Sequence, residues 1–362
     1  MTSVLDLPST RQEAWRWSDP QAIAAAAAST HQESDLDPDS LFLDLDGPRL
    51  LFVDGVFDAG QSEAGTVSIG PLAIGSDHPL GRKATGPGWR LALGREHATG
   101  PVQIVHLSTG ADNHLPAEIV LEEDAAASLV ETFAGSGGWA NRLTRISLGR
   151  SARLMRSVRL LQAEGFVSVR DEAVVGQGAS LVSTLLGAGD MGSRYDAELT
   201  LEGEGAFAEV GGALLARGDR KQEAAVVVRH AAPGGTSRQL WRLVAGDRAV
   251  ASAAARVEVA RGAQRTDGEQ SLRGLLLDRT ATVNLKPELE IFADDVKCAH
   301  GATVGELDAQ ALFYLASRGI PPVEARALLT RAFVGDALAR IGQDVVRDAF
   351  ERDADRWLEA RA

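Results

Sequence analysis

Cys298 and His300 are the residues of this chain with the clearest potential for chemistry. They lie in the segment DDVKCAHGATVG, residues 294–305. In an extended segment, residues i and i+2 share one face and lie about 6.5–7 Å apart along the strand. A thiol and an imidazole at that spacing could bind one metal ion, or both could lie in an interface. Cys298 is the only cysteine among 362 residues, so it has no partner for an internal disulfide.

Three roles for this pair follow from the residues alone. A Cys–His nucleophilic pair usually takes its base from a distant segment and needs a third orienting group, so the short spacing disfavours catalysis. As metal ligands, the pair supplies at most two of the about four donors of a closed site, and the others must come from elsewhere, such as another subunit. The structural alternative makes Cys298 a small buried hydrophobic side chain and His300 a satisfied histidine beside Gly301.

Composition restricts the partners of the chain. A formal charge of −13 with only four lysines argues against a nucleic-acid-binding face. One cysteine excludes an iron–sulfur or zinc site made only of cysteines of this chain. The most apolar early run, AIAAAAA (22–28), is too short to span a bilayer, and no basic-then-apolar leader opens the sequence. We therefore expect a cytoplasmic protein without a membrane segment.

Common catalytic motifs are missing from the sequence. No Gly-Lys dipeptide occurs, which excludes a P-loop and argues against ATP hydrolysis by this chain. No Gly-x-Ser-x-Gly nucleophile elbow is present either. We expect structural roles for the other histidines, which are His31, His78, His97, His106, His114 and His230. Ser237 is the expected hydrogen-bond partner of His230.

The elements that position Cys298 and His300 are short apolar runs separated by Gly, Asp and Arg. PVQIVHLS (101–108) and AEIVLEED (117–124) are typical strands. A Gly-x-Gly/Ser-Ala turn recurs at Gly149, Gly176 and Gly203, at equal intervals of 27 residues. A repeating unit of that length favours a solenoid in which each coil buries its apolar face against the next, over a Greek-key sandwich. The sequence thus predicts an all-β core, a parallel β-helix.

The two ends of the chain differ from this core. Residues 1–95 are predicted to be helical and irregular, with Ser9 and Thr10 as capping residues and Pro20 as a helix breaker or starter. Residues 96–305 form the predicted β-helix. Residues 306–362 are predicted to form three helices, the first ending at Gly319. These helices either pack on the end of the solenoid or offer a face to another protein.

Three stretches resemble the SufB/SufD family of iron–sulfur cluster assembly proteins. LKPELEIFADDVKCAHGATVGELDAQALFYLASRGIPPVEARALLTRAF (285–333) resembles its C-terminal core signature. Residues 227–281, with a His before a Pro turn, then Ser, Ala-Gln, Asp-x-x-Gln and a triple Leu, are similar to the same family, as is LPSTRQEAWRWSD (7–19). Within the family, CAHGATVGELD is more similar to the SufD branch than to the SufB branch, because of Gly301 and the Val304-Gly305 pair.

This resemblance implies a fold, partners and site residues. It implies a right-handed parallel β-helix between N- and C-terminal helical regions. It also implies a non-catalytic scaffold that pairs with SufB as a heterodimer and that binds the SufC ATPase. A homodimer of the isolated chain stays open as an alternative. His300 matches a histidine at the interface where a transient iron–sulfur cluster forms, and Cys298 matches the same motif. No cluster is expected on the isolated chain.

The resemblance further implies that the C-terminal helices contact SufC. Its FYLASRG signature contains the candidate partner-binding residues Phe313, Tyr314, Arg318 and Gly319. Two alternatives stay open. One is a SufB-like paralogue, which the single cysteine disfavours. The other is a solitary β-helix enzyme acting on a sugar polymer, with Asp294, Asp295 and Lys297 as its candidate groups.

Overall fold

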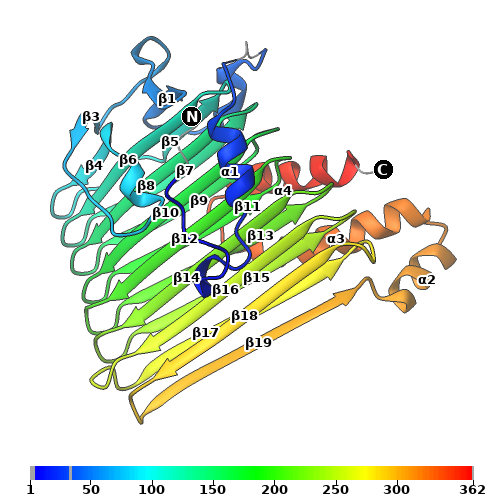
Figure 1. Cartoon of the computed structure of the whole chain (residues 1–362). Helices are drawn as coiled ribbons and strands as arrows, with labels where there is room; N and C mark the ends of the chain where they lie inside the picture. Colours follow the sequence, from blue (N-terminus) through cyan, green and yellow to red (C-terminus); the bar gives the residue numbers. More distant parts are fainter. Residues whose placement is uncertain (1–4, 32–34, 361–362) are drawn as a thin grey trace.

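The computed structural model describes residues 5–31 and 35–360, so residues 1–4 and 361–362 at the outer ends of the predicted terminal regions lie outside it. Within these ranges the chain forms a stack of strands in two sheets, with helices at both ends of the sequence (Figure 1). The predicted all-β core, a parallel β-helix flanked by helical regions, is confirmed.

Strands that follow one another in the core alternate between the two sheets. Sheet A has the order β19-β17-β15-β13-β11-β9-β7-β5-β1-β2, and sheet B has the order β18-β16-β14-β12-β10-β8-β6-β4-β3. The strands of sheet A are β1 (Arg49–Val53), β2 (Val56–Phe57), β5 (Val102–Ser108), β7 (Ala126–Gly135), β9 (Arg153–Leu160), β11 (Ser180–Gly187), β13 (Phe207–Ala216), β15 (Thr236–Ala245), β17 (Thr266–Leu276) and β19 (Val296–Glu306). Those of sheet B are β3 (Val67–Leu72), β4 (Gly86–Leu93), β6 (Asp112–Leu121), β8 (Trp139–Leu148), β10 (Phe166–Val175), β12 (Gly192–Leu201), β14 (Lys221–His230), β16 (Val250–Val259) and β18 (Thr282–Ile291).

The 27-residue interval in the sequence is the length of one coil. Arg153 of β9 pairs in parallel with Ser180 of β11, which pairs with Phe207 of β13, so each of these coils places its strand beside the previous one at that offset. The repeated turns stack in the same way, since the backbone N–H of Gly176 donates to the carbonyl of Leu148 at 2.9 Å. The predicted strands 101–108 and 117–124 correspond to β5 and to the end of β6.

The repeated turn has a conformational cause. Its third residue adopts a left-handed backbone in successive coils, with φ of +55° at Ser151, +60° at Gly178 and +68° at Gly205. Glycine adopts this region without steric cost, which explains its recurrence at the turn. The residue after each of these positions is a fully buried alanine, which turns the chain back into the core: Ala152, Ala179 and Ala206.

The first 95 residues contain strands that the sequence analysis did not predict. β1 pairs with β2, and β3 pairs with β4, both antiparallel, and β1 and β4 continue the parallel sheets through β5 and β6. The prediction of helical and irregular structure is wrong for these segments. These strands are short or interrupted, as at Gly70 and Pro71 of β3, and the parallel partners of β1 and β4 are distant in sequence, so local periodicity does not reveal them.

The N-terminal helical prediction holds only in part. Ser9 starts no α-helix, and the following residues form a single 3-10 turn, η1 (Glu13–Trp15). The first α-helix, α1 (Pro20–Ala27), begins at the predicted starter Pro20, and Asp19 caps it by accepting a hydrogen bond from the N–H of Ala22. The other 3-10 turns are η2 (Pro38–Leu41), η3 (Ala59–Gln61) and η4 (Gly81–Lys83).

Three C-terminal helices form as predicted: α2 (Ala309–Ser317), α3 (Pro322–Leu338) and α4 (Asp344–Glu359). α3 and α4 do not cover the end of the solenoid; they pack along the outer side of sheet A, where Leu338, Phe350 and Trp357 join one apolar cluster with Leu215 and Val244. α2 buries none of its residues. No helix in the described ranges is long and apolar enough to cross a bilayer.

Candidate functional site

The C-terminal end of the solenoid is open. β18 and β19 are the last strands of sheets B and A, so each has a paired strand on one side only. Most residues of β19 are exposed, whereas β17, its neighbour in sheet A, alternates between buried and accessible positions. At the other end, β2 and β3 pair antiparallel with β1 and β4, the last parallel strands of the two sheets. The open end therefore presents backbone and side chains that a further coil would otherwise cover.

Register shows which side chains of β19 belong to the interior. The buried residues Gly268, Gln270 and Leu272 of β17 pair with Cys298, His300 and Ala302. Because side chains alternate along a strand, Cys298 and His300 continue the inward-facing columns of sheet A. They are accessible because no following coil lies over them.

β18 contributes apolar side chains to the same end. The buried residues Ala253, Ala255 and Val257 of β16 pair with Leu285, Pro287 and Leu289. We call the inward-facing residues of the last two strands the terminal face. It consists of Val283, Leu285, Pro287, Leu289 and Ile291 from β18 and of Val296, Cys298, His300, Ala302 and Val304 from β19. Apart from the thiol of Cys298 and the imidazole of His300, the side chains of the terminal face are apolar.

Cys298 is half-buried at this face. It packs against an apolar cluster that includes Val257, Val259 and Ala293. Its sulfur lies over Gly268, where an added Cβ atom would be 3.4 Å from Sγ. Burial raises the pKa of the Cys298 thiol, and a hydrogen bond from the Gly268 backbone lowers it only in part. The thiol therefore resists ionisation until a metal ion or another positive charge comes close.

His300 is exposed, and the residue beneath it is unusual. Its register partner Gln270 is only 1% exposed, and within the described residues neither its side-chain oxygen nor its nitrogen has a hydrogen-bond partner. Gln270 belongs to the Asp-x-x-Gln element noted in the sequence, but the sequence analysis gave it no role. Only the pairing of β17 with β19 places it beside His300.

The candidate partner-binding residues lie on α2 and directly after its last residue. Phe313 and Tyr314 are 76% and 57% exposed, and the Arg318 guanidinium lies 5.3 Å from the centre of the Tyr314 ring. Gly319 ends the helix region with φ of +84°, the left-handed conformation predicted for it. A groove of about 560 Å³ lies beside α3 and α4, with Val323, 57% exposed, in its lining.

The groups proposed for a polymer-cleaving enzyme do not form a cleft. Asp294 and Asp295 are exposed in the turn between β18 and β19, and Lys297 points outward at the start of β19. The backbone N–H of Asp295 is bound by the side chain of Gln264, as expected for a turn residue. In the described part of the chain, no three His, Cys, Asp or Glu side chains are grouped to hold a metal ion.

A second cluster of titratable groups lies inside the middle coils. Arg156, fully buried, donates to Glu131 at 2.6 Å and to Asp171 at 2.5 Å. Glu131 pairs with Nε2 of His106 at 2.8 Å, and Tyr195 donates to Asp171 at 2.9 Å. These five residues, which we call the inner network, connect both sheets across the interior.

Together with the buried Arg142, the inner network is electrically matched, because two guanidinium groups face two carboxylates. Burial would raise the pKa of Glu131, but the Arg156 charge and the His106 hydrogen bond lower it to about 2. Burial lowers the pKa of His106 to about 4, assisted by the charge of Arg142 and opposed by Glu131. Arg142 donates to Nδ1 of His106 at 3.2 Å, which leaves Nε2–H to donate to Glu131. Each charge is thus offset within the chain, which indicates a structural role.

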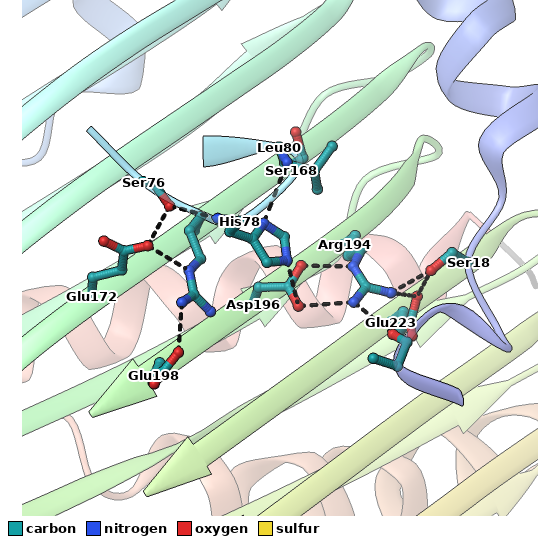
Figure 2. A network of polar contacts seen from close by, with 12 residues as sticks. Ser18, Ser76, His78, Leu80, Ser168, Glu172, Arg194, Asp196, Glu198 and Glu223 are labelled. Carbon is teal, nitrogen blue, oxygen red and sulfur yellow. Dashed lines mark hydrogen bonds and ion pairs between the residues drawn. The ribbon is translucent and has the colours of Figure 1, made fainter. Parts of the chain in front are cut away.

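Figure 2 shows a third polar network, on the outer side of sheet B. Arg194 of β12 binds Asp196 and Glu223, and Asp196 lies 3.5 Å from Nε2 of His78. The Arg194 guanidinium also lies 4.2 Å from the ring centre of Trp15. This network fastens the N-terminal segment, dark blue in Figure 1, across the strands.

Structural roles were expected for the other histidines, and the following ones have partners within the chain. Nε2 of His230 lies 2.8 Å from Oγ of Ser237, the pair suggested by the sequence, and His97 bonds to the carbonyl of Arg95 in an exposed turn. His78 and His106 belong to the networks described above.

Comparisons with known proteins give one consistent result. Residues 108–333 match the family described as the SufBD core domain of SUF system FeS cluster assembly. The iron–sulfur cluster assembly protein SufD of Escherichia coli (strain K12) is 27% identical over 93% of this chain and 89% of its own length. An iron–sulfur cluster assembly SufBD family protein of Mycobacterium tuberculosis is 30% identical over 78% of this chain and 68% of its own length. The chloroplastic protein ABCI7 of Arabidopsis thaliana is 32% identical over 64% of this chain and 50% of its own length.

Proposed function

Because the chain belongs to the SufBD family of iron–sulfur cluster assembly proteins, we propose that it is a SufD-type scaffold subunit whose open end completes a cluster-forming site with a SufB-type partner. The observation that carries this proposal is the terminal face. It places the imidazole of His300 and the thiol of Cys298 on one accessible surface of an otherwise apolar core.

The terminal face has the properties of an interface between two solenoids. Ile291 and Val304 are 39% and 46% exposed there, and Phe292, directly after β18, is 66% exposed. β19 contains no proline over its eleven residues, so its edge can pair with a strand of another chain. A partner that ends in a similar coil would cover these apolar groups and surround Cys298 and His300.

The number of ligands that Cys298 and His300 supply explains why a partner subunit is needed. Iron–sulfur clusters are held mainly by cysteine thiolates, and histidine replaces cysteine in some of them. Two donors, of which one is a thiol with a raised pKa, hold such a cluster weakly. Thiolates from the partner would supply the remaining ligands, and the cluster is then a transient product that both subunits release. His300 is the more accessible donor of the two, so we assign the main role to it.

ATP hydrolysis belongs to a third protein in this proposal. The chain has no P-loop, whereas α2 exposes Phe313 and Tyr314 on a helix that packs on little else. We assign this surface to a SufC-type ATPase. α3 and α4 pack on sheet A, so closure of two such ATPases could pull on the solenoids and change their contact, as in other domain closures. The expected setting is the cytoplasm.

The cluster-forming role is tested with a reconstituted complex. His300→Ala should still assemble with purified SufB-type and SufC-type partners but should yield no cluster on anaerobic reconstitution with iron and sulfide, followed by visible absorption. His97→Ala is the matched control, because His97 is also exposed and lies in a turn of an early coil. A normal cluster yield with His300→Ala would refute the proposal.

The two partner surfaces are separated by a crossed pair of variants. Phe313→Ser on α2 should weaken binding of the SufC-type protein and leave the SufB-type protein bound, and Phe292→Ser beside the terminal face should do the reverse. Binding is measured with purified partners by calorimetry. Loss of both partners from either variant, or of neither from both, would contradict this assignment.

A further inference from the structure

Three polar side chains follow one another in the inward column that ends at the terminal face. Gln239 of β15 pairs in register with Gln270 of β17, and Gln270 pairs with His300 of β19. The residue before them in the same column, Val210 of β13, is apolar and buried. The polar run therefore begins in the interior and ends at the accessible imidazole.

The two glutamines are buried but incompletely bonded. Each is 1% exposed. Nε2 of Gln239 donates to the carbonyl of Arg256 at 3.0 Å. Within the described residues, Oε1 of Gln239 and both Nε2 and Oε1 of Gln270 have no partner. A buried polar group without a partner costs about 1–3 kcal/mol, so such atoms are expected to find one another or a ligand.

These unpaired atoms are complementary along the column. Neighbouring strands lie about 4.7–4.9 Å apart, and stacked glutamine amides in register form ladders at that spacing. The bond to Arg256 fixes the amide nitrogen of Gln239, so its oxygen is left as an acceptor for the amide nitrogen of Gln270. The oxygen of Gln270 then remains as an acceptor for the next residue of the column, which is His300.

We propose that Gln270 is a positioning residue that accepts the ring N–H of His300 and so holds the imidazole in one tautomer, with its other ring nitrogen free to bind iron. The consequence for iron rests on the function proposed above. Metal-binding histidines generally donate their second ring nitrogen to an oxygen acceptor, which fixes the tautomer and the ring orientation. The glutamine ladder supplies such an acceptor from inside the solenoid.

The neighbouring column has no equivalent device. In this column Cys298 pairs in register with Gly268, which has no side chain, and Gly268 pairs with Ser237. The hydroxyl of Ser237 is already paired with His230. The ladder thus prepares the histidine and leaves the thiol without a side-chain partner in its column. This difference agrees with the assignment of His300 as the principal donor.

The tautomer is measured directly on the full chain by long-range ¹H–¹⁵N NMR, with His300 assigned from its loss in His300→Ala. The wild-type protein should show one tautomer of neutral His300. Gln270→Met, which keeps the length of the side chain but removes its oxygen, should give a mixture. Gln270→Glu restores an acceptor and should return a single tautomer.

Gln239→Met provides a matched control one strand deeper. It removes an equally buried amide but leaves the oxygen of Gln270 beside His300, so its spectrum should lie closer to that of the wild type than the spectrum of Gln270→Met does. A His300 tautomer that is unchanged in Gln270→Met, or equal spectra for Gln270→Met and Gln270→Glu, would overturn the inference.

Reconstitution of the complex separates this inference from the proposed function. Gln270→Met should weaken metal binding at the site by about 10–100-fold, the usual effect of removing such a hydrogen-bond partner, measured by titration of the complex with ferrous iron. If His300→Ala leaves cluster yield unchanged, the proposed function fails, although the tautomer result can stand. If Gln270→Met leaves the tautomer unchanged, the positioning role fails whatever the cluster yield.

Discussion

Arg156 and His300 occupy one column of inward-facing positions in sheet A, the first in the middle coils and the second at the open end. Around Arg156 the charges are paired: its guanidinium binds Glu131 and Asp171, which bind further side chains in turn, although Oδ1 of Asp171 has no partner in the described chain. Around His300 the polar atoms of Gln270 are left without partners in the described chain. The same architecture thus holds one polar cluster whose charges are paired within the chain and one whose polar atoms lack partners.

This difference distinguishes polar side chains that stabilise the fold from polar side chains that are available to a ligand. A buried charge whose partners all come from the same chain contributes to folding and has no capacity left for a ligand. An inward-facing polar group at an uncovered end contributes little to folding and gains its partner on assembly. The inner network and the terminal face should therefore respond to mutation in opposite ways.

The largest effect on stability should follow removal of Arg156. Arg156→Ala leaves Glu131 and Asp171 buried without their common partner, and breaking a buried ion pair typically costs about 3–5 kcal/mol of the free energy of unfolding. Urea unfolding followed by circular dichroism measures the loss. Arg150→Ala, which breaks an ion pair with Glu123 at an exposed turn, is the control and should cost about 1 kcal/mol or less. A similar loss in both variants would break the comparison.

The inner network should also make stability depend on pH. The pKa of His106 is lowered to about 4 in the folded chain, so between pH 6.5 and 4 the unfolded chain binds more protons than the folded one. The free energy of unfolding should therefore decrease as pH falls through this window, by a few kcal/mol at most, since each unit of pKa difference is worth about 1.4 kcal/mol. Glu131, with its pKa lowered to about 2, continues the loss below pH 4.5.

Urea unfolding at pH 7, 6 and 5 measures this dependence. The variant His106→Gln keeps a side chain able to bond Glu131 but removes the titrating imidazole, so its slope with pH should be smaller between pH 6.5 and 4. An unchanged slope would assign the pH dependence to other residues.

The smallest effect on stability should come from the terminal face. His300→Ala removes an exposed side chain, and exposed substitutions away from special features usually change stability by less than about 0.5 kcal/mol. The hydrogen bond proposed between His300 and Gln270 adds about 0.5–1.5 kcal/mol. The free energy of unfolding of the isolated chain should therefore fall by less than about 2 kcal/mol. A loss comparable to that of Arg156→Ala would mean that His300 has a structural role, and the comparison between the two regions would fail.

The parts of this structure that sequence predicts are those encoded locally. The turn residues at Gly149, Gly176 and Gly203 recur because each coil needs the same bend, and this recurrence predicted the solenoid. Alternation along a strand likewise predicted that Cys298 and His300 share a face. Their roles stay predictions until the experiments above are performed.

The parts that sequence does not predict depend on pairing between distant coils. Gln270 pairs with His300 because the last coil is longer than 27 residues. The inner network joins Arg156 to Glu131, 25 positions away, and to Asp171, 15 positions away on the opposite sheet. No local pattern contains these separations, so the positions of the polar clusters emerge only with the register.

The most direct test of the central claim is a measurement of the bond between His300 and iron. The complex is reconstituted with only this chain labelled with ¹⁵N-histidine, and the one-electron-reduced cluster is examined by pulsed EPR. The account predicts a ¹⁵N hyperfine coupling from one imidazole, and its loss in His300→Ala. A cluster that forms in the wild-type complex without any coupling to the labelled histidine would contradict it.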